Sequence, residues 1–253
     1  MSDKLLVGEF QPMAMHRTVS YVQLGRIAYH EALQIQTLLK RCMLDKIRSP
    51  RTSRPEVQDT LLICEHEPVY TVGLRHADYL ASEEQRLREL GADFHRTNRG
   101  GLITFHGPGQ LMAYPIINLA HYTKSVRWYI SQLERTIIST CKDFGIAATT
   151  SPDTGVWVND NKVAAIGIQC SRYITMHGLS LNCNTDLSWF EHIVPCGIKD
   201  KGVTSLTREL KREITVQEVV PVFLEAFARE FDCSVVESAE KDLARISNFE
   251  SCL

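Results

Sequence analysis

The sequence predicts an α+β domain, a single domain with a mixed or antiparallel sheet and flanking helices. Helical segments are interleaved with many short strands, several of them joined by tight turns, and no regular strand–helix–strand alternation appears. A doubly wound parallel sheet is therefore disfavoured. The length of 253 residues and the 44% hydrophobic composition are sufficient to bury one substantial core.

Helices are expected where apolar residues recur every three or four positions. Three segments share this spacing: Leu33–Met43, Val126–Phe144 before Gly145, and a segment that begins with Thr215 and Glu218 as a capping box. Ser82 and Gln85 fit another capping box, for a short helix that ends near Gly91. Pro221 would remove a hydrogen bond from the last helix, so we expect its first turn to be separate or kinked.

Strands are expected over short apolar or alternating runs bounded by turn residues. These runs are Thr60–Cys64, Val69–Val72, Leu102–His106, Leu111–Leu119, Gly155–Val158, Val163–Cys170 and Ile174–Asn182. We expect the first two to pair around a turn at Pro68, and Asn159-Asp160-Asn161 to form a turn between two others. The segment from Arg48 to Asp59 is rich in Ser, Pro, Arg and Thr, which predicts an exposed loop.

Bulk properties exclude several functional classes. The net charge of −2, from 28 basic and 30 acidic side chains, provides no field that would draw the chain onto nucleic acid or an anionic membrane. No apolar run approaches the roughly 20 residues that cross a bilayer, and Met1 to Ser20 lacks the apolar stretch of a secretory signal. The eight cysteines lack the dense spacing of a disulfide scaffold, which favours a reducing compartment.

The segment from Arg99 to Gln110 concentrates four glycines and a proline around a short strand. Glycine lets a backbone approach a ligand closely or adopt positive φ, while Thr104 and His106 add polar groups. The segment therefore fits the wall of a ligand site, with a tight hairpin as the alternative. It matches neither a dinucleotide fingerprint nor a phosphate loop, because the spacing and the terminal Lys-Ser/Thr are absent.

Cys196 lies between Pro195, which fixes one φ angle, and Gly197, which removes side-chain bulk beside the sulfur. This context suits a thiol that is presented to a substrate, although most cysteines are buried and inert. A cysteine with an ordinary pKa of ~8.5 is mostly protonated at neutral pH and needs an activator. The candidate activators are Lys162, His106, His177 and His192. Lys162 is favoured because it opens a strand directly after a turn, where its ammonium can face a pocket.

Two other kinds of site share these residues. A zinc site would use His177, Cys183, His192 and Cys196, although no Cys-x-x-Cys or His-x3-His pair is present. A cysteine hydrolase would pair Cys196 with His177, and with Asn182 or Asn184 as the orienting residue. The residues alone leave both alternatives open.

Four separate motifs occur in order along the chain. They are Arg-Gly-Gly-x-x-Thr-Phe-His-Gly-Pro-Gly-Gln from Arg99, Lys-Val-Ala-Ala-Ile-Gly from Lys162, His-Gly-Leu-Ser-Leu-Asn from His177 and Pro-Cys-Gly-Ile from Pro195. With these motifs combined, roughly Tyr21 to Phe231 resembles the lipoyl(octanoyl) transferase family of lipoate synthesis. The resemblance implies a catalytic fold shared with biotin and lipoate protein ligases.

The resemblance also implies an activity, which is transfer of octanoyl from acyl carrier protein to a lysine on a lipoyl domain, with no cofactor and no metal. It assigns Cys196 as the acyl-thioester residue and Lys162 as the residue that lowers the pKa of this cysteine. The implied acyl-site lining is Arg99, Gly100, Gly101, Leu102, Ile103, Thr104, Phe105, His106, Ala165, Ile166, Gly167, Gly178, Leu179 and Ser180. Ser180 stands where many relatives carry alanine, a change that could trim the pocket.

The implied acceptors are lipoyl-domain proteins such as glycine cleavage H protein and the E2 subunits of 2-oxoacid dehydrogenases. The run from Trp189 to Cys196 is similar to animal members, which are mitochondrial, so we expect a mitochondrial protein although Met1 to Ser20 is a poor transit peptide by composition. We divide the chain into an N-terminal extension (1–18), an octanoyltransferase catalytic domain (19–236) and a C-terminal tail (237–253). An ATP-dependent lipoate or biotin ligase of the same fold, which would not need the cysteine, is the alternative.

Overall fold

The computed structural model describes residues 17–49, 58–75, 79–197 and 201–238, except for the side chain of Cys196. Most of the predicted N-terminal extension, nearly all of the predicted tail and most of the loop between Arg48 and Asp59 lie outside the described residues. No described helix is long and apolar enough to cross a membrane.

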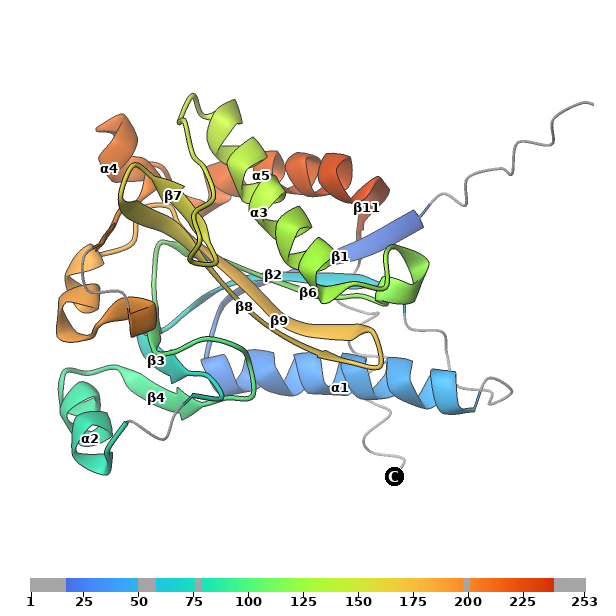
Figure 1. Ribbon diagram of the computed structural model, residues 1–253, viewed down its shortest axis with the longest axis horizontal. Coiled ribbons are helices and arrows are strands. Elements are labelled where there is room, and N and C mark those ends of the chain that lie inside the picture. The colour runs from blue at the N-terminus through green and yellow to red at the C-terminus, as the bar shows by residue number, and fades with distance from the viewer. Residues whose placement is uncertain (1–16, 50–57, 76–78, 198–200, 239–253) are drawn as a thin grey trace, which may run out of the picture.

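The larger of two sheets contains eight strands and forms the centre of the fold (Figure 1). Its strand order is β10-β8-β9-β6-β2-β1-β11, with β7 paired to β8. The strands are β1 (Arg17–Ile27), β2 (Thr60–His66), β6 (Gln110–Ile116), β7 (Val156–Val158), β8 (Asn161–Ser171), β9 (Ile174–Asn182), β10 (Gly202–Val203) and β11 (Cys233–Glu237). The pairs of β1 with β2 and β11, and of β10 with β8, are parallel, whereas the central pairs are antiparallel. The predicted mixed sheet is confirmed.

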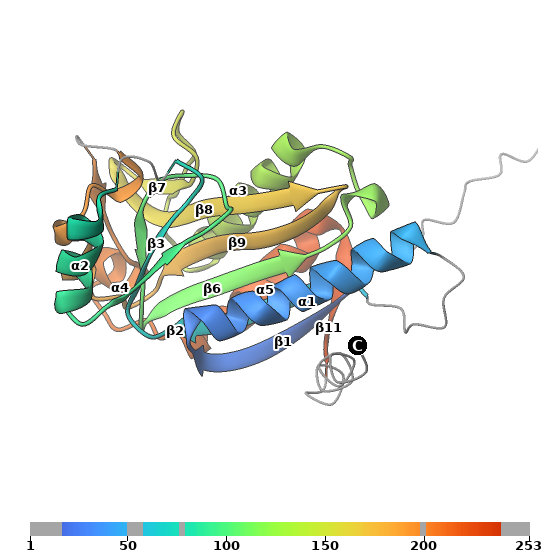
Figure 2. The ribbon, with the colours of Figure 1, turned by 90° about the horizontal axis from the view of Figure 1, so that it is seen from below.

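Helices cover both faces of this sheet (Figures 1 and 2). Helix α1 (Tyr29–Arg48) runs along one face, and α3 (Val126–Asp143) and α5 (Val216–Phe231) pack on the other. Side chains of β2 alternate between the two layers, because successive residues of a strand point to opposite faces. Leu61 and Ile63 pack with α3 and α5, whereas Leu62 and Cys64 pack with α1. Because its side chains alternate between the two faces of the sheet, β2 contributes to the hydrophobic core on each face.

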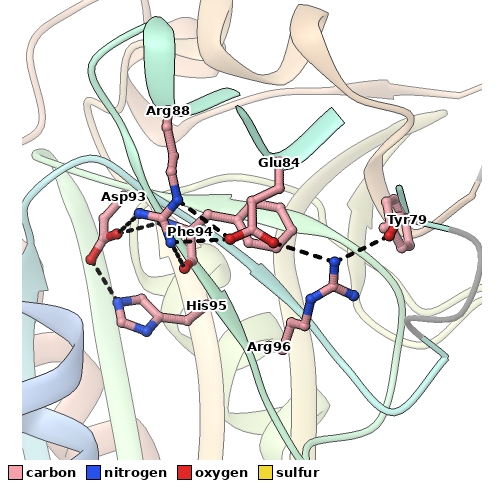
Figure 3. Close-up of polar contacts among 7 residues, drawn as sticks. All are labelled: Tyr79, Glu84, Arg88, Asp93, Phe94, His95 and Arg96. Carbon is pink, nitrogen blue, oxygen red and sulfur yellow. Dashed lines mark hydrogen bonds and ion pairs between the residues drawn. The ribbon is translucent and has the colours of Figure 1, made fainter. Parts of the chain in front are cut away.

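A second, three-stranded sheet has the order β4-β3-β5 and is covered by α2 (Ala81–Glu89). Its strands are β3 (Val69–Val72), β4 (Asp93–Arg96) and β5 (Thr104–His106). Its core contains Tyr70, Phe94 and Phe105. Arg88 ties α2 to β4 through Asp93 Oδ1 at 2.5 Å and the Phe94 carbonyl at 2.7 Å (Figure 3).

The expected pairing of the strands on either side of Pro68 is wrong. Strand β2 pairs with β1 and β6 in the large sheet, whereas β3 pairs with β4 and β5 in the small one. Both edges of β2 are therefore already occupied, and the turn at Pro68 carries the chain from one sheet to the other.

Two expectations about helix ends also differ from the structure. Helix α2 begins one residue before Ser82, and its N-cap, Leu80, makes no side-chain capping bond, so the predicted capping box is wrong. Helix α5 runs through Pro221 without a separate first turn. Pro221 and Gln217 are exposed, so water can satisfy the carbonyl that loses its partner. At the start of α5, Thr215 Oγ1 accepts from the Glu218 N–H at 3.2 Å, which confirms that cap.

Short elements complete the described fold. They are η1 (Leu119–His121), η2 (Leu187–His192), η3 (Pro195–Gly197) and α4 (Leu206–Leu210). Gly145, with φ of 78°, follows the end of α3 as predicted, and Asn159, with φ of 53°, forms the turn between β7 and β8. Pro195 of η3 lines a surface pocket together with Asn161 at the start of β8 and with Gly202 and Val203 of β10, which places the backbone of Cys196 near this edge of the large sheet.

Candidate active site

A cavity lies between the glycine-rich segment, the start of α1 and the strands β6, β8 and β9. It is lined by Tyr29, Arg99, Gly101, Thr104, His106, Met112, Tyr114, Ala165, Ile166, Gly167, His177, Gly178, Leu179 and Ser180. Met112, Ile166 and Leu179 form an aliphatic part of its wall. The remaining large side chains of the lining are Arg99 and the aromatic residues Tyr29, His106, Tyr114 and His177. A cavity with this mixture can hold an alkyl chain against its aliphatic part.

Ten of the fourteen predicted acyl-site residues line this cavity. Gly100 and Leu102 line an adjoining open groove instead, together with Lys162. Ile103 and Phe105, each 1% exposed, are buried in the core of the small sheet. The alternation of strand side chains explains this split, because Thr104 and His106 face the cavity when their neighbours face the other way. Contact of these residues with a substrate stays a prediction.

Glycines allow the walls to come this close. A Cβ on Gly178 would overlap the carbonyl oxygen of Ala113 on β6, and a Cβ on Gly167 would lie 3.0 Å from the carbonyl oxygen of Gly100. The Gly100 N–H in turn donates to the Ile168 carbonyl at 2.9 Å. The glycine-rich segment is therefore fastened to β8, and the glycines in two of the motifs have a steric reason.

Arg99 organises the segment from within. Its guanidinium donates through Nη2 to the Thr71 carbonyl at 2.7 Å and to Thr71 Oγ1 at 2.8 Å, and through Nη1 to the Gly100 carbonyl at 2.8 Å. The side chain is buried. Arg99 therefore both lines the cavity and holds the segment against β3.

Two buried histidines lie at the cavity: His106 lines it, and His66 bonds Tyr114 of its wall. His66 Nδ1 donates to the Ile27 carbonyl at 2.8 Å, so its Nε2 accepts from the Tyr114 hydroxyl at 2.7 Å. His106 Nδ1 donates to Gln110 Oε1 at 2.8 Å, and its Nε2 accepts from the Thr71 hydroxyl at 3.1 Å. Burial lowers the pKa of His66 to about 4 and that of His106 to about 3. Both rings are therefore uncharged at neutral pH and act as fixed hydrogen-bonding groups.

Lys162 lines both the open groove and a smaller chamber that adjoins the cavity. The chamber shares Thr104, Ala165 and Ser180 with the cavity, and its lining also includes Lys162, Gln110, Asn182, Phe190 and Pro195. Lys162 is only 7% exposed, its Nζ donates to the Thr154 carbonyl at 3.1 Å, and it lies 4.7 Å from the centre of the Trp157 ring. The predicted position at the start of a strand and beside a pocket is confirmed.

The backbone of η3 brings Cys196 to this chamber. Pro195, directly before it, lines the chamber with Lys162. Gly197, directly after it, has a φ of 73°, and a Cβ there would lie 2.7 Å from Leu102 Cδ1. The side chain of Cys196, and Ile198 of the same motif, lie outside the described residues. The positive φ of Gly197 favours glycine there, whereas the Leu102 side chain could move aside for a Cβ.

The described residues of the two alternative sites have other surroundings. Among the described residues, no group of three or more His, Cys, Asp or Glu side chains is arranged to hold a metal ion. His177 is buried in the cavity wall and pairs with Asn98, Cys183 is fully buried, and His192 is exposed. Asn182 bonds Gln110 and the Thr204 carbonyl, and Asn184 donates to Glu213 Oε1, so neither orients His177.

Several lining residues were not among those predicted for the acyl site. Tyr29, Met112 and Tyr114 come from the first turn of α1 and from β6, and nothing local in their sequence distinguishes them from core residues. His177 opens the His-Gly-Leu-Ser motif and was considered only as a metal ligand, activator or base. Its φ of 58°, unusual for a residue other than glycine, becomes visible only in the structure.

The fold and the site together define a member of the lipoate protein ligase structural class. A lipoate protein ligase from T. acidophilum superimposes with a TM-score of 0.66 at 13% identity, over 91% of this chain and 93% of that one. This likeness confirms the predicted fold. Residues 36–228 match the family described as the lipoyl protein ligase A/B catalytic domain.

Sequence relatives give the family more closely. The octanoyl-acyl-carrier-protein:protein N-octanoyltransferase of Danio rerio is 61% identical over 86% of this chain and 94% of its own length. The Homo sapiens protein of the same name is 46% identical over 86% of this chain and 95% of its own length. Both are named as mitochondrial, in agreement with the predicted location. The chain belongs to the lipoyl protein ligase A/B catalytic domain family and is an acyltransferase within it.

Proposed function

We propose that this enzyme transfers octanoyl from octanoyl-acyl carrier protein to the acceptor lysine of lipoyl domains, through a thioester on Cys196. The observation that carries the proposal is the chamber that Lys162 shares with Pro195, the residue before Cys196, and that adjoins the acyl cavity. The names of the relatives support the donor, and the known acceptors of lipoylation, glycine cleavage H protein and E2 subunits, are the proposed partners.

In the first half-reaction, the Cys196 thiolate attacks the carbonyl carbon of the donor thioester. The bond between that carbon and the carrier's sulfur breaks, and the Lys162 ammonium gives its proton to the departing thiolate. Octanoyl is then held as a thioester on Cys196, with its tail in the cavity and Lys162 as a neutral amine.

In the second half-reaction, the amine of the acceptor lysine attacks the Cys196 thioester. The carbon–sulfur bond breaks, an amide forms, and Lys162 takes the proton that the acceptor nitrogen loses. The ammonium and thiolate pair is then restored. One lysine thus serves both steps with no net gain or loss of protons, and no nucleotide is needed.

The test is the intact mass of the wild type, Cys196→Ser and Lys162→Ala after incubation with octanoyl-acyl carrier protein. We expect an octanoyl adduct on the wild type, none on Cys196→Ser, and slower formation on Lys162→Ala. If no variant is acylated while octanoate and ATP together support modification of a lipoyl domain, the enzyme is an adenylating ligase and the proposal is wrong.

A further inference from the structure

The part of the acyl cavity that His177 lines is polar, which an octanoyl tail does not require. Ala165 lines both the chamber and the cavity, and three residues further along β8 Ile168 is the register partner of His177. Three residues of strand span roughly 10 Å, about the length of an extended octanoyl chain. An acyl group attached at the chamber therefore ends near His177.

His177 presents an unsatisfied acceptor there. Its side chain is 1% exposed and its Nε2 lies 2.8 Å from Asn98 Oδ1, so Nε2 carries the hydrogen and Nδ1 carries a lone pair. Nδ1 has no hydrogen-bond partner within the described residues. Burial lowers the pKa of His177 to about 3, with a further contribution from Arg99, so the ring remains neutral.

The backbone holds the imidazole in place. His177 adopts a φ of 58°, and its N–H donates to Gln36 Oε1 of α1 at 2.9 Å. A left-handed histidine is an uncommon conformation that persists where the surroundings enforce it. The buried, unpartnered Nδ1 is therefore held in a fixed place in the cavity wall.

Tyr29 adds a donor to the same cavity. Its ring is stacked on His106, with centroids 6.3 Å apart and planes at 1°, and meets the edge of His66 at 5.3 Å. His95, whose Nε2 bonds Asp93 Oδ2 (Figure 3), packs against the same ring with centroids 5.2 Å apart. The ring is thus fixed on several sides, and its hydroxyl makes no hydrogen bond to another described residue.

An alkyl terminus would cover these two groups without bonding either of them. Each buried polar group left unsatisfied costs about 1–3 kcal/mol, whereas a hydroxyl can donate to one and accept from the other. We propose that the acyl site takes medium-chain acyl groups that carry a hydroxyl on the terminal carbon, bound by His177 Nδ1 and the Tyr29 hydroxyl. The inference rests on the proposed function, since it requires the acyl chain to enter from the chamber.

The test compares 8-hydroxyoctanoyl with nonanoyl, both loaded on acyl carrier protein, because these two chains differ only in a terminal hydroxyl against a methyl. The measured quantity is kcat/KM for acyl-enzyme formation. We expect the wild type to use the hydroxylated chain at least as well as nonanoyl, whereas an apolar pocket would favour nonanoyl by about tenfold or more.

Variants identify the groups responsible. Tyr29→Phe and His177→Asn, the latter a residue that tolerates the left-handed backbone, are each expected to shift the preference toward nonanoyl by about tenfold. Tyr114→Phe is the matched control, since it also removes a hydroxyl from the cavity wall, but one already bonded to His66. We expect it to leave the preference unchanged, whatever its absolute rate.

A tenfold wild-type preference for nonanoyl, or a preference that neither variant alters, would overturn the inference and leave an ordered water as the partner of both groups. Octanoyl-acyl carrier protein is run alongside. If octanoyl acylates the wild type while the hydroxylated chain fails, only this inference is lost. If octanoyl fails as well, the proposed function is lost.

Discussion

Lys162 Nζ lies 4.7 Å from the centre of the Trp157 ring. The two residues are register partners on the neighbouring strands β7 and β8, which are connected by a tight turn. Lys201 Nζ lies 4.5 Å from the same ring centre, so the two ammonium groups are at most about 9 Å apart. Trp157 is itself anchored by its Nε1–H, which donates to the Asp153 carbonyl at 3.1 Å. The lysine is therefore positioned by an aromatic face and a carbonyl before any substrate arrives.

The two roles proposed for Lys162 can be separated with Lys162→Arg. Arginine retains the positive charge that stabilises a thiolate but does not release its proton in proteins. We expect acylation by octanoyl-acyl carrier protein to be slowed but measurable, and transfer to a lipoyl domain to fall by about a hundredfold or more. Single-turnover mass spectrometry follows both steps. Lys201→Arg keeps a cation over Trp157 and is the control, and wild-type transfer rates in Lys162→Arg would refute the proton-transfer role.

Buried histidines should make folding stability depend on pH. The folded-state pKa values of His66 and His106, lowered by burial to about 4 and about 3, lie below the ordinary value of ~6.5 that applies to the unfolded chain. The unfolded chain therefore binds protons first as the pH falls. The free energy of unfolding should therefore be at its full value above about pH 6.5. Below that pH it should fall by about 1.4 kcal/mol per pH unit for each histidine, until the folded-state pKa of that histidine is reached.

Urea unfolding between about pH 7 and pH 5 measures this slope. The exposed His30 provides the control, since His30→Gln should leave the slope as it is. A free energy of unfolding that stays constant over this range would mean that the folded chain takes up as many protons as the unfolded chain, so that burial does not lower the pKa of these rings.

The extent to which the site could be predicted from sequence follows from how each residue reaches it. The glycine motifs and Lys162 could be predicted because their signal is local: glycine at close contacts, and lysine at the start of a strand. The whole run from Arg99 to His106 could not be assigned to the cavity, because alternation sends Ile103 and Phe105 to the other face. Tyr29 reaches the cavity only through the packing of α1 on the sheet, which no short sequence pattern encodes.

The fold shows the same limit. Strands β6, β7, β8 and β9 form antiparallel pairs and have clear strand patterns, and tight turns connect β7 to β8 and β8 to β9. The sequence predicts these strands. Strand β1 was missed, and so was its partner β11, which lies at the far end of the described chain. The two strands pair in parallel although they come from opposite ends of the described sequence, with Arg17 opposite Cys233. Such a non-local pairing leaves no local turn signal in the sequence.

Gly178→Ala tests the close approach of β9 to β6. The added methyl would overlap the Ala113 carbonyl and lie 2.9 Å from Pro115 Cδ, and neither backbone can withdraw without disturbing the sheet. We expect a loss of about 1–3 kcal/mol in the free energy of unfolding, measured by chemical denaturation. Gly100→Ala is the control, because its nearest neighbour would be the Ile168 carbonyl at 3.7 Å, an ordinary contact. Equal stability of the two variants would show that the sheet can adapt at Gly178.

The segment that leads to Cys196 is held from the small sheet. The Tyr70 hydroxyl donates to the Trp189 carbonyl at 2.8 Å, and Arg86 Nη2 of α2 donates to the His192 carbonyl at 2.7 Å. Trp189 stacks on Phe105 with centroids 5.1 Å apart and planes at 4°. These contacts fix the segment a few residues before Cys196, the proposed nucleophile, so we expect α2 and β3 to influence the position of Cys196 without touching the substrate.

Arg86→Met should therefore slow acylation of Cys196 several-fold, since misplacement of a reacting group weakens the gain from proximity, while the thermal midpoint changes little because Arg86 is largely exposed. The matched control is Arg88→Met on the same helix, whose guanidinium bonds Glu84, Asp93 and the Phe94 carbonyl (Figure 3). Arg88 ties α2 to β4 but has no bond to the segment before Cys196, so acylation should proceed at the wild-type rate. If both variants slow acylation equally, the effect comes from the packing of α2 as a whole. A selective effect of Arg86→Met would instead assign the effect to its bond with the His192 carbonyl.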